Sequence, residues 1–213
     1  MLDNNFDFVD LFETRLCEYT GFKYAVCVDC CTNGILISLE MLRRLGCVDK
    51  NTPISIPRNT YMSVPMTLIN NGWKISLIDE HWSGFYRIGN TKVFDSATDF
   101  HENMSQDYDN DFIVCVSFQQ KKRLSLGRGG VIFVDNEDYH AILKRMVHDG
   151  RNSKLSQVLE VNDHPDDIIL GYHCYLEPEK AALGITKLNQ PLPEYVKHSF
   201  LEYPDLCDLK TLH

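Results

Sequence analysis

The sequence predicts an α/β fold with a largely parallel sheet and helices on both of its faces. Short apolar segments of strand length alternate along the chain with longer segments whose apolar residues recur at helical spacing. This alternation is typical of layered α/β proteins. Polar residues also follow several predicted strands directly, and the carboxyl ends of parallel strands form the edge of a sheet where such proteins bind ligands.

Turn residues and periodicity set the expected helices. The first ends at Gly21, the second ends at Gly46 after a face of leucine and isoleucine residues, and the third ends near Gly72. The last contains Ala181 and Ala182, which suit close packing. In chain order, the predicted helices are 8–19, 32–45, 61–70, 137–147 and 178–188.

Short apolar segments between these helices give the expected strands. Those at 74–78 and 92–94 end at Asp79 and Asp95, and the strand at 112–118 contains Ser117. The tail beyond Pro191 is rich in proline, tyrosine and charge and is expected to be peripheral. In chain order, the predicted strands are 24–28, 53–56, 74–78, 92–94, 112–118 and 131–134.

Composition excludes several classes of protein. The net charge of −9 argues against binding to nucleic acid, because phosphate neutralisation needs clustered lysine and arginine. The 8 cysteines lie mostly in apolar or helical segments, where cysteine behaves as a small hydrophobic residue, so neither a disulfide scaffold nor a metal site is expected. The first residues lack the pattern of a signal peptide, and no apolar segment is long enough to span a membrane, so we expect a cytoplasmic protein.

The segment from Ser117 to Gly130 carries the strongest chemical signal. A serine is followed five residues later by Lys122, and a turn with the sequence Gly-Arg-Gly-Gly leads into the next strand. This resembles the Ser-Phe-x-x-x-Lys and Gly-Glu-Gly-Gly motifs of the DegT/DnrJ-type sugar aminotransferases, which use pyridoxal 5′-phosphate. The resemblance implies that Lys122 is the catalytic lysine that binds this cofactor. Lys121 is the alternative, which the spacing from Ser117 disfavours, and a basic cluster taken alone is equally typical of a solvated loop.

The strand end at Asp95 resembles a second motif of the family. Phe94-Asp95-Ser96-Ala97 is similar to Glu-Asp-x-Ala, with Phe94 in place of the glutamate and Ala97 matching the alanine. The resemblance implies that the Asp95 carboxylate contacts the pyridine nitrogen of the cofactor and keeps it protonated. The alternative is that Asp95 caps a following helix.

Four further positions are implied to contact the cofactor. Cys31 and Thr32 stand before a helix where relatives show Gly-Thr, and a helix N-terminus is a natural phosphate site, to which Ser117 adds a second hydroxyl. Tyr61 ends a segment similar to Pro-x-x-Thr-aromatic, in which the aromatic side chain stacks on the cofactor ring. The alternatives are that Thr32 is a simple N-cap and that Tyr61 belongs to the core.

The segment around His173 resembles the Gly-x-Asn-x-Arg motif of the family, with His173 in place of the asparagine and Tyr175 in place of the arginine. In relatives the asparagine reaches the cofactor phosphate of the other subunit. The resemblance therefore implies a homodimer in which His173 donates to that phosphate.

The resemblance covers residues 12–188 and implies the large domain of a fold-type I, aspartate-aminotransferase-like enzyme in a minimised form. Residues 1–190 would be this domain, shortened between 79 and 95 by one strand and its helix, and residues 191–213 a tail in place of the usual small domain.

The implied activity is transfer of an amino group from an amino acid, glutamate in most relatives, to a nucleotide-linked keto-sugar in polysaccharide biosynthesis. Lys122 would also act as general acid and base, and Lys121, Arg123 and Arg128 are available to the diphosphate. Two alternatives stay open. One is a sugar dehydratase or lyase with the same cofactor, whose relatives tend to have histidine in place of the lysine, and the other is a non-catalytic binding protein.

Overall fold

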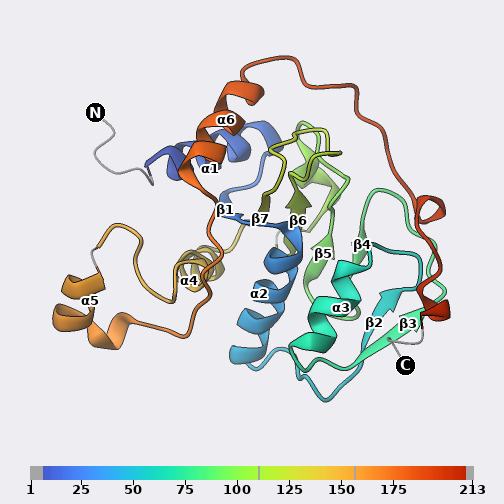
Figure 1. The fold of residues 1–213 in the computed structure, drawn as a ribbon, viewed down its shortest axis with the longest axis horizontal. Helices are drawn as coiled ribbons and strands as arrows, with labels where there is room; N and C mark the ends of the chain where they lie inside the picture. Colours follow the sequence, from blue (N-terminus) through green and yellow to red (C-terminus); the bar gives the residue numbers. More distant parts are fainter. Residues whose placement is uncertain (1–6, 110, 156, 210–213) are drawn as a thin grey trace.

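A sheet of five strands in the order β1-β7-β6-β5-β4 forms the centre of the fold (Figure 1). The computed structural model describes residues 7–109, 111–155 and 157–209. A separate parallel pair, β2 (Ile54–Pro57) and β3 (Ile75–Ile78), lies beyond the β4 side of the sheet. The strands of the central sheet are β1 (Tyr24–Val28), β4 (Tyr86–Arg87), β5 (Val93–Asp95), β6 (Ile113–Ser117) and β7 (Gly130–Val134).

The expected α/β class is confirmed, but the expectation of a largely parallel sheet is wrong. In the central sheet only β5 and β6 run parallel, whereas the β1–β7, β6–β7 and β4–β5 pairs are antiparallel. The cause is the length and content of the connections. A parallel return needs a crossover, usually with a helix, and the loop from β6 to β7 and the turn from β4 to β5 contain none.

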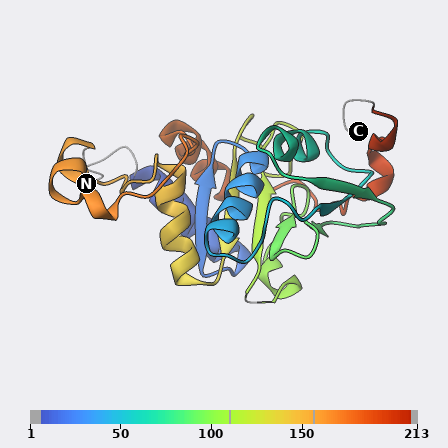
Figure 2. The ribbon, with the colours of Figure 1, turned by 90° about the horizontal axis from the view of Figure 1, so that it is seen from below.

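Helices cover both faces of the sheet, as expected. Alternate residues of β6 show the two sides: Ile113 and Cys115 belong to a core with α2 and α4, and Val114 and Val116 to a core with α1 and α6. Figure 2 shows α2 and α4 together on one side of the strands. The helices are α1 (Asp7–Thr20), α2 (Cys31–Arg44), α3 (Ser63–Asn70), α4 (Glu137–Val147), α5 (Gln157–Asp163) and α6 (Pro178–Leu188).

The elements expected from the sequence all occur, with ends that differ by one or two residues. The unexpected ones are short: β4, α5 and four 3-10 turns. These turns are η1 (Met104–Asp107), η2 (Pro165–Asp167), η3 (Phe200–Glu202) and η4 (Leu206–Asp208). Every helix among the described residues is too short or too polar to cross a lipid bilayer.

The segment between β3 and β5 is a short connection. It contains β4 but no helix, and β4 forms a hairpin with β5 in which Tyr86 lies opposite Asp95. This places a tyrosine from the shortened segment directly beside the aspartate at the end of β5.

The tail beyond 191 is not peripheral, contrary to expectation. It runs from α6 across the molecule to the β2–β3 pair (Figure 1). The Asn59 amide donates to the Tyr203 carbonyl at 3.0 Å, the Leu206 N–H donates to the Arg58 carbonyl at 3.0 Å, and the Leu206 side chain is buried. These contacts could not be predicted from the sequence because their partners lie far away along the chain.

A buried ion pair attaches α1 to α4 and β1. The Lys144 Nζ lies 2.8 Å from the Glu13 Oε2 and 3.0 Å from the Asp10 Oδ1, and the other oxygen of Glu13 accepts the Cys27 N–H at 2.8 Å. Glu13 is buried, and burial raises its pKa against the opposing effect of Lys144. Asp10 also pairs with Lys154, whose side chain is 65% exposed.

We predict that Lys144→Met destabilises the protein by about 3 kcal/mol, because it leaves the buried Glu13 without its cation. The matched variant Lys154→Met, which removes an exposed partner of the same cluster, should cost no more than about 0.5 kcal/mol. Urea denaturation at neutral pH measures both. Equal losses of stability in the two variants would show that the Lys144–Glu13 pair stabilises the protein no more than the exposed contact of Lys154 does.

Candidate active site

A cavity of about 390 Å³ lies where β5 and β6 end and α2 begins. Ligand cavities in proteins are commonly of this size. The residues around it come from segments far apart in the sequence, which the fold brings to one place. Of the residues singled out in the sequence, it is lined by Cys31, Thr32, Tyr61, Asp95, Ala97, Ser117 and Lys122.

Lys122 lies in the loop after β6 with a partly buried side chain. Its own N–H donates to the Gln119 carbonyl at 2.9 Å. Burial lowers the pKa of the Lys122 amine, and the nearby Asp95 carboxylate opposes that shift. Lys121 is exposed and does not line this cavity. Between the two candidate lysines, the structure therefore places Lys122 in the cavity.

Arg123, which follows Lys122, is fixed by hydrogen bonds to other parts of the fold. The Arg123 guanidinium donates to the Pro193 carbonyl at 2.7 Å, to the Tyr19 hydroxyl at 2.8 Å and to the Phe100 carbonyl at 3.0 Å. These contacts fix the loop against α1 and the tail.

Asp95 is buried at the end of β5. Its Oδ1 accepts the Ala97 N–H at 3.0 Å, and its Oδ2 accepts the Tyr86 hydroxyl at 2.6 Å. Burial raises the pKa of Asp95, and the Tyr86 and Ala97 hydrogen bonds and the Lys122 charge oppose the rise. A turn rather than a helix follows Asp95, so this carboxylate does not cap a helix.

The N-terminus of α2 opens onto the same cavity. Cys30 is the N-cap residue without a side-chain cap, so Thr32 is the second residue of the helix rather than its cap. The Thr32 and Ser63 hydroxyls lie 2.7 Å apart. A Cβ at Gly130 would lie 2.6 Å from the Cys31 nitrogen, so only glycine lets β7 begin this close to the helix end. Unpaired N–H groups at such an end attract anions.

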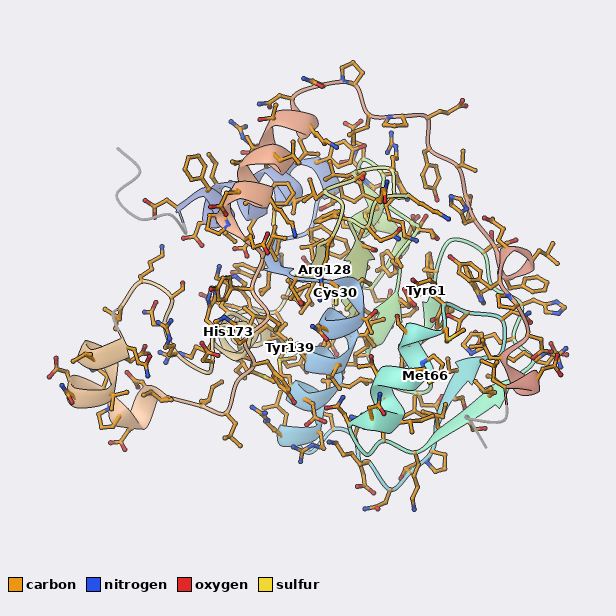
Figure 3. The ribbon with its side chains drawn as sticks, in the orientation of Figure 1. Cys30, Tyr61, Met66, Arg128, Tyr139 and His173 are labelled. Carbon is orange, nitrogen blue, oxygen red and sulfur yellow. The ribbon has the colours of Figure 1, made fainter. Side chains whose placement is uncertain are left out.

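Ser117, Tyr61 and Arg128 complete the lining. The Ser117 hydroxyl accepts the Gln119 N–H at 3.3 Å at the end of β6. Tyr61 is 59% exposed, so it is not a core residue. The Arg128 Nη2 lies 2.8 Å from the Asp29 Oδ2, close to Cys30 at the start of α2 (Figure 3).

His173 lies outside the cavity. Figure 3 shows it on the opposite side of α2 from Tyr61. Its side chain is 70% exposed, and its Nδ1 lies 3.1 Å from the Asp149 Oδ2. Within one chain it therefore does not join the other candidate residues, and its contact with a phosphate stays a prediction.

Several residues of the lining are not among those expected from the sequence. Thr60 is the threonine of the Pro-x-x-Thr-aromatic segment that ends at Tyr61, so its place in the lining could have been predicted from that motif. Trp82, Tyr86 and Tyr203 also line the cavity, but they come from the shortened segment and the tail, for which no motif was available.

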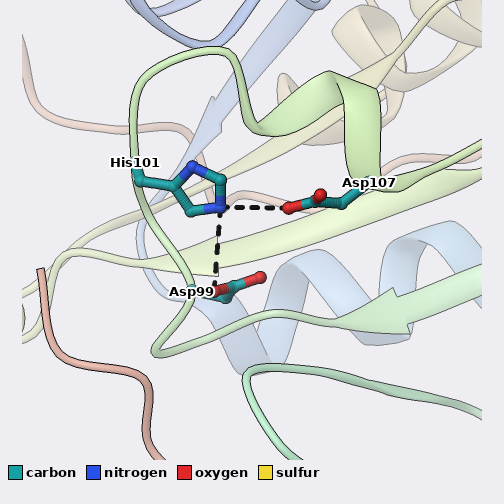
Figure 4. A group of neighbouring side chains, drawn as sticks. All are labelled: Asp99, His101 and Asp107. Atoms are coloured by element: carbon teal, nitrogen blue, oxygen red, sulfur yellow. Dashed lines mark ion pairs between the residues drawn. The ribbon is translucent and has the colours of Figure 1, made fainter.

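A second group of polar side chains lies in the loop after β5. The His101 Nε2 is 3.1 Å from an Asp107 oxygen and 3.9 Å from the Asp99 Oδ1 (Figure 4). The buried Asp99 also accepts the Tyr195 hydroxyl, and the His101 ring packs against Tyr195. These contacts attach the tail to this loop.

The sequence matches a family profile over most of its length. Residues 2–85 and 109–198 match the DegT/DnrJ/EryC1/StrS aminotransferase family. A search of curated proteins found no match.

Solved structures of aminotransferases share the fold at low sequence identity. The sugar aminotransferase CalS13 from Micromonospora echinospora is 15% identical with a TM-score of 0.67, and the matched region covers 86% of this chain and 60% of that one. NtdA from Bacillus subtilis, with bound cofactor PMP, is 16% identical with a TM-score of 0.60 over 85% and 47% of the chains. PseC from Helicobacter pylori, an aminotransferase in pseudoaminic acid biosynthesis, is 16% identical with a TM-score of 0.57 over 85% and 57%.

This chain thus spans less than two thirds of the length of these structures. The likeness establishes the fold, which is that of the fold-type I aminotransferases that use pyridoxal phosphate, as expected from the sequence.

The lowered pKa of Lys122 predicts that its amine is acetylated by acetic anhydride with a pH midpoint below the ordinary lysine value of about 10.4. Because the Asp95 carboxylate stabilises the ammonium form, Asp95→Asn should lower that midpoint further. Asp111→Asn, which removes an exposed carboxylate paired with Lys92, should leave it unchanged. Mass spectrometry of the Lys122 peptide across a pH series measures the midpoint, and a rise in Asp95→Asn would contradict the assigned geometry.

Proposed function

This chain belongs to the DegT/DnrJ/EryC1/StrS aminotransferase family, and from that membership we propose that it is a pyridoxal-phosphate-dependent aminotransferase. The proposed reaction moves an amino group from an amino acid, glutamate, to a nucleotide-linked keto-sugar. The observation that carries the proposal is the cavity in which a partly buried amine and a buried carboxylate, Lys122 and Asp95, meet the N-terminus of α2.

The groups around the cavity fit this cofactor. The hydroxyls of Thr32 and Ser117 and the first N–H groups of α2, which begins at Cys31, would hold its phosphate. Asp95 would accept a hydrogen bond from the N–H of the protonated ring nitrogen. Tyr61, with its exposed ring beside the cavity, would cover one face of the ring.

The chemistry divides between the cofactor and the chain. Pyridoxal phosphate, when bound, supplies an electron sink for the charge that develops on the amino-acid carbon. Lys122 would bind the cofactor covalently, which its lowered pKa favours by providing the neutral amine, and would then move a proton to and from the substrate carbon. Asp95 would hold a proton at the ring nitrogen, and Trp82 and Tyr203 would exclude water from the cavity.

A second cavity beside the first would hold the sugar substrate. This second cavity, of about 640 Å³, shares Tyr61, Lys122 and Tyr203 with the first and continues between Lys121 and the tail. We assign the keto-sugar to it, with Lys121 available to the diphosphate. Arg123 lines this cavity too, but its guanidinium already makes three hydrogen bonds to the scaffold.

We further propose a cytoplasmic homodimer. The side chain of His173, which is 70% exposed and pairs with Asp149 through Nδ1, would meet the cofactor phosphate of the other subunit, as the family motif implies. Cys27, Cys31, Cys115 and Cys174 are buried as free thiols that pack as small hydrophobic residues, which suits a reducing compartment. Residues 1–190 would form the cofactor-binding unit, and the segment from 191 onward would close one side of it.

We predict that pyridoxal phosphate added to the purified protein gives an absorbance band at the visible edge of the ultraviolet. Borohydride reduction should then leave the mass of the cofactor on the Lys122 peptide. Lys122→Ala should lose both signals, since it removes the amine, whereas Lys121→Ala should keep both.

Glutamate added to the loaded protein should convert the cofactor to pyridoxamine phosphate, which separates a transaminase from a lyase or dehydratase. Absence of the absorbance band in the wild-type protein would overturn both enzyme assignments. Labelling at Lys121 instead would overturn the assignment of the lysine.

A further inference from the structure

The carboxylate of Asp95 is approached by Tyr86, a tyrosine of the shortened segment between β3 and β5. The Tyr86 hydroxyl donates to the Asp95 Oδ2 at 2.6 Å, and the Thr60 hydroxyl lies 2.5 Å from the Tyr86 oxygen. All three side chains are buried, with 4%, 5% and 1% exposure for Tyr86, Asp95 and Thr60, and all three line the cavity.

The direction of this hydrogen-bond chain follows from proton counting. A tyrosine hydroxyl has one hydrogen, which Tyr86 gives to the Asp95 carboxylate. The hydrogen between Thr60 and Tyr86 must then come from Thr60. A hydroxyl that accepts one hydrogen bond is polarised into a better donor, so Thr60 strengthens the bond from Tyr86 to the carboxylate.

The backbone fixes this tyrosine in place. Tyr86 lies directly opposite Asp95 in the antiparallel β4–β5 pair, so the two side chains emerge on the same face. The Trp82 ring packs against the Tyr86 ring at 5.3 Å, and the Trp82 Nε1 donates to the Asn59 carbonyl at 2.8 Å. The hydroxyl therefore has little freedom to turn away from the carboxylate.

We propose that Tyr86 is a positioning residue for the cofactor, which orients the Asp95 carboxylate and keeps it ionised opposite the ring nitrogen. This inference rests on the proposed function. One oxygen of Asp95 is held by the Ala97 N–H and the other by Tyr86, and each oxygen keeps a lone pair for a further donor. Through Tyr86, the shortened segment between β3 and β5 would thereby help to keep the ring nitrogen of the cofactor protonated.

The titratable groups around Asp95 show why a hydrogen bond from the Tyr86 hydroxyl would matter for its ionised form. The titratable groups that face this carboxylate are Tyr86 from β4, Cys31 from α2, Cys115 from β6, Tyr203 from the tail and Lys122 from the loop after β6. Lys122 is the one cation in this set, and covalent attachment to a cofactor would remove its charge. The hydrogen bond from Tyr86 would then remain as a side-chain contact that favours the ionised carboxylate.

The test compares equilibrium binding of two ligands to wild-type protein and Tyr86→Phe. One is pyridoxal phosphate, and the other is its 1-deaza analogue, in which a C–H group replaces the ring nitrogen. Tyr86→Phe should weaken binding of pyridoxal phosphate about tenfold, the scale of one hydrogen bond to an ionised group, and should change binding of the analogue less than about twofold. Thermal unfolding of each variant reports whether it is folded.

Tyr108→Phe is the matched control. Tyr108 is also a buried tyrosine with a hydrogen-bonded hydroxyl, 2.5 Å from the Ser96 Oγ, but it lines neither cavity. Tyr108→Phe should leave the affinity for both ligands unchanged. If Tyr86→Phe does not fold, Thr60→Val tests the same chain of hydroxyls and should weaken binding of pyridoxal phosphate alone, by about threefold.

The outcomes separate this inference from the proposed function. Equal binding of pyridoxal phosphate to wild-type and Tyr86→Phe would overturn the role of Tyr86 and leave the proposed function intact. An equal loss for both ligands would also overturn it, because the effect would not pass through the ring nitrogen. Failure of the wild-type protein to bind pyridoxal phosphate would overturn the proposed function itself.

Discussion

The buried carboxylate of Asp95 constrains the arrangement of the groups around the cavity. An ionised group removed from water costs several kcal/mol unless donors and an opposite charge compensate it. The Ala97 N–H, the Tyr86 hydroxyl and the Lys122 amine provide that compensation. They come from the turn after β5, from the hairpin strand β4 and from the loop after β6, so three segments meet at one buried carboxylate.

Hydrogen bonds hold the loop between β6 and β7, which presents Lys122 and not Lys121 to the first cavity. The Phe118 N–H donates to the Gly129 carbonyl at 2.9 Å and the Gln120 N–H to the Gly127 carbonyl at 3.1 Å, which continues the pairing of the two strands into the loop. Arg123 fixes the far side of the loop through its guanidinium. Arg123 is thus part of the scaffold, and its contribution is to hold Lys122 at the cavity.

The sequence could predict those parts of the site that follow regular strands or precede a regular helix. Asp95, Ser117 and Thr32 could be found in this way because strand ends and helix starts carry local signals. Tyr86 could not, since a strand of two residues has no period. Strand direction could not either, because a strand that is buried on both faces, such as β7, has the same apolar pattern whichever way it runs.

The hairpin that contains β4 also links the tail to the carboxylate. The Trp82 ring packs against both Tyr86 and Tyr203 at 5.3 Å, and the Phe200 N–H donates to the Trp82 carbonyl at 3.2 Å. The stretch from 79 to 92 is too short to hold the helix and strand of a parallel crossover, so it turns back beside β5 and reaches both partners. Trp82 thus packs between Tyr203 of the tail and the tyrosine whose hydroxyl contacts Asp95. Closure of the cavity by the tail and placement of its buried charge depend on the same hairpin.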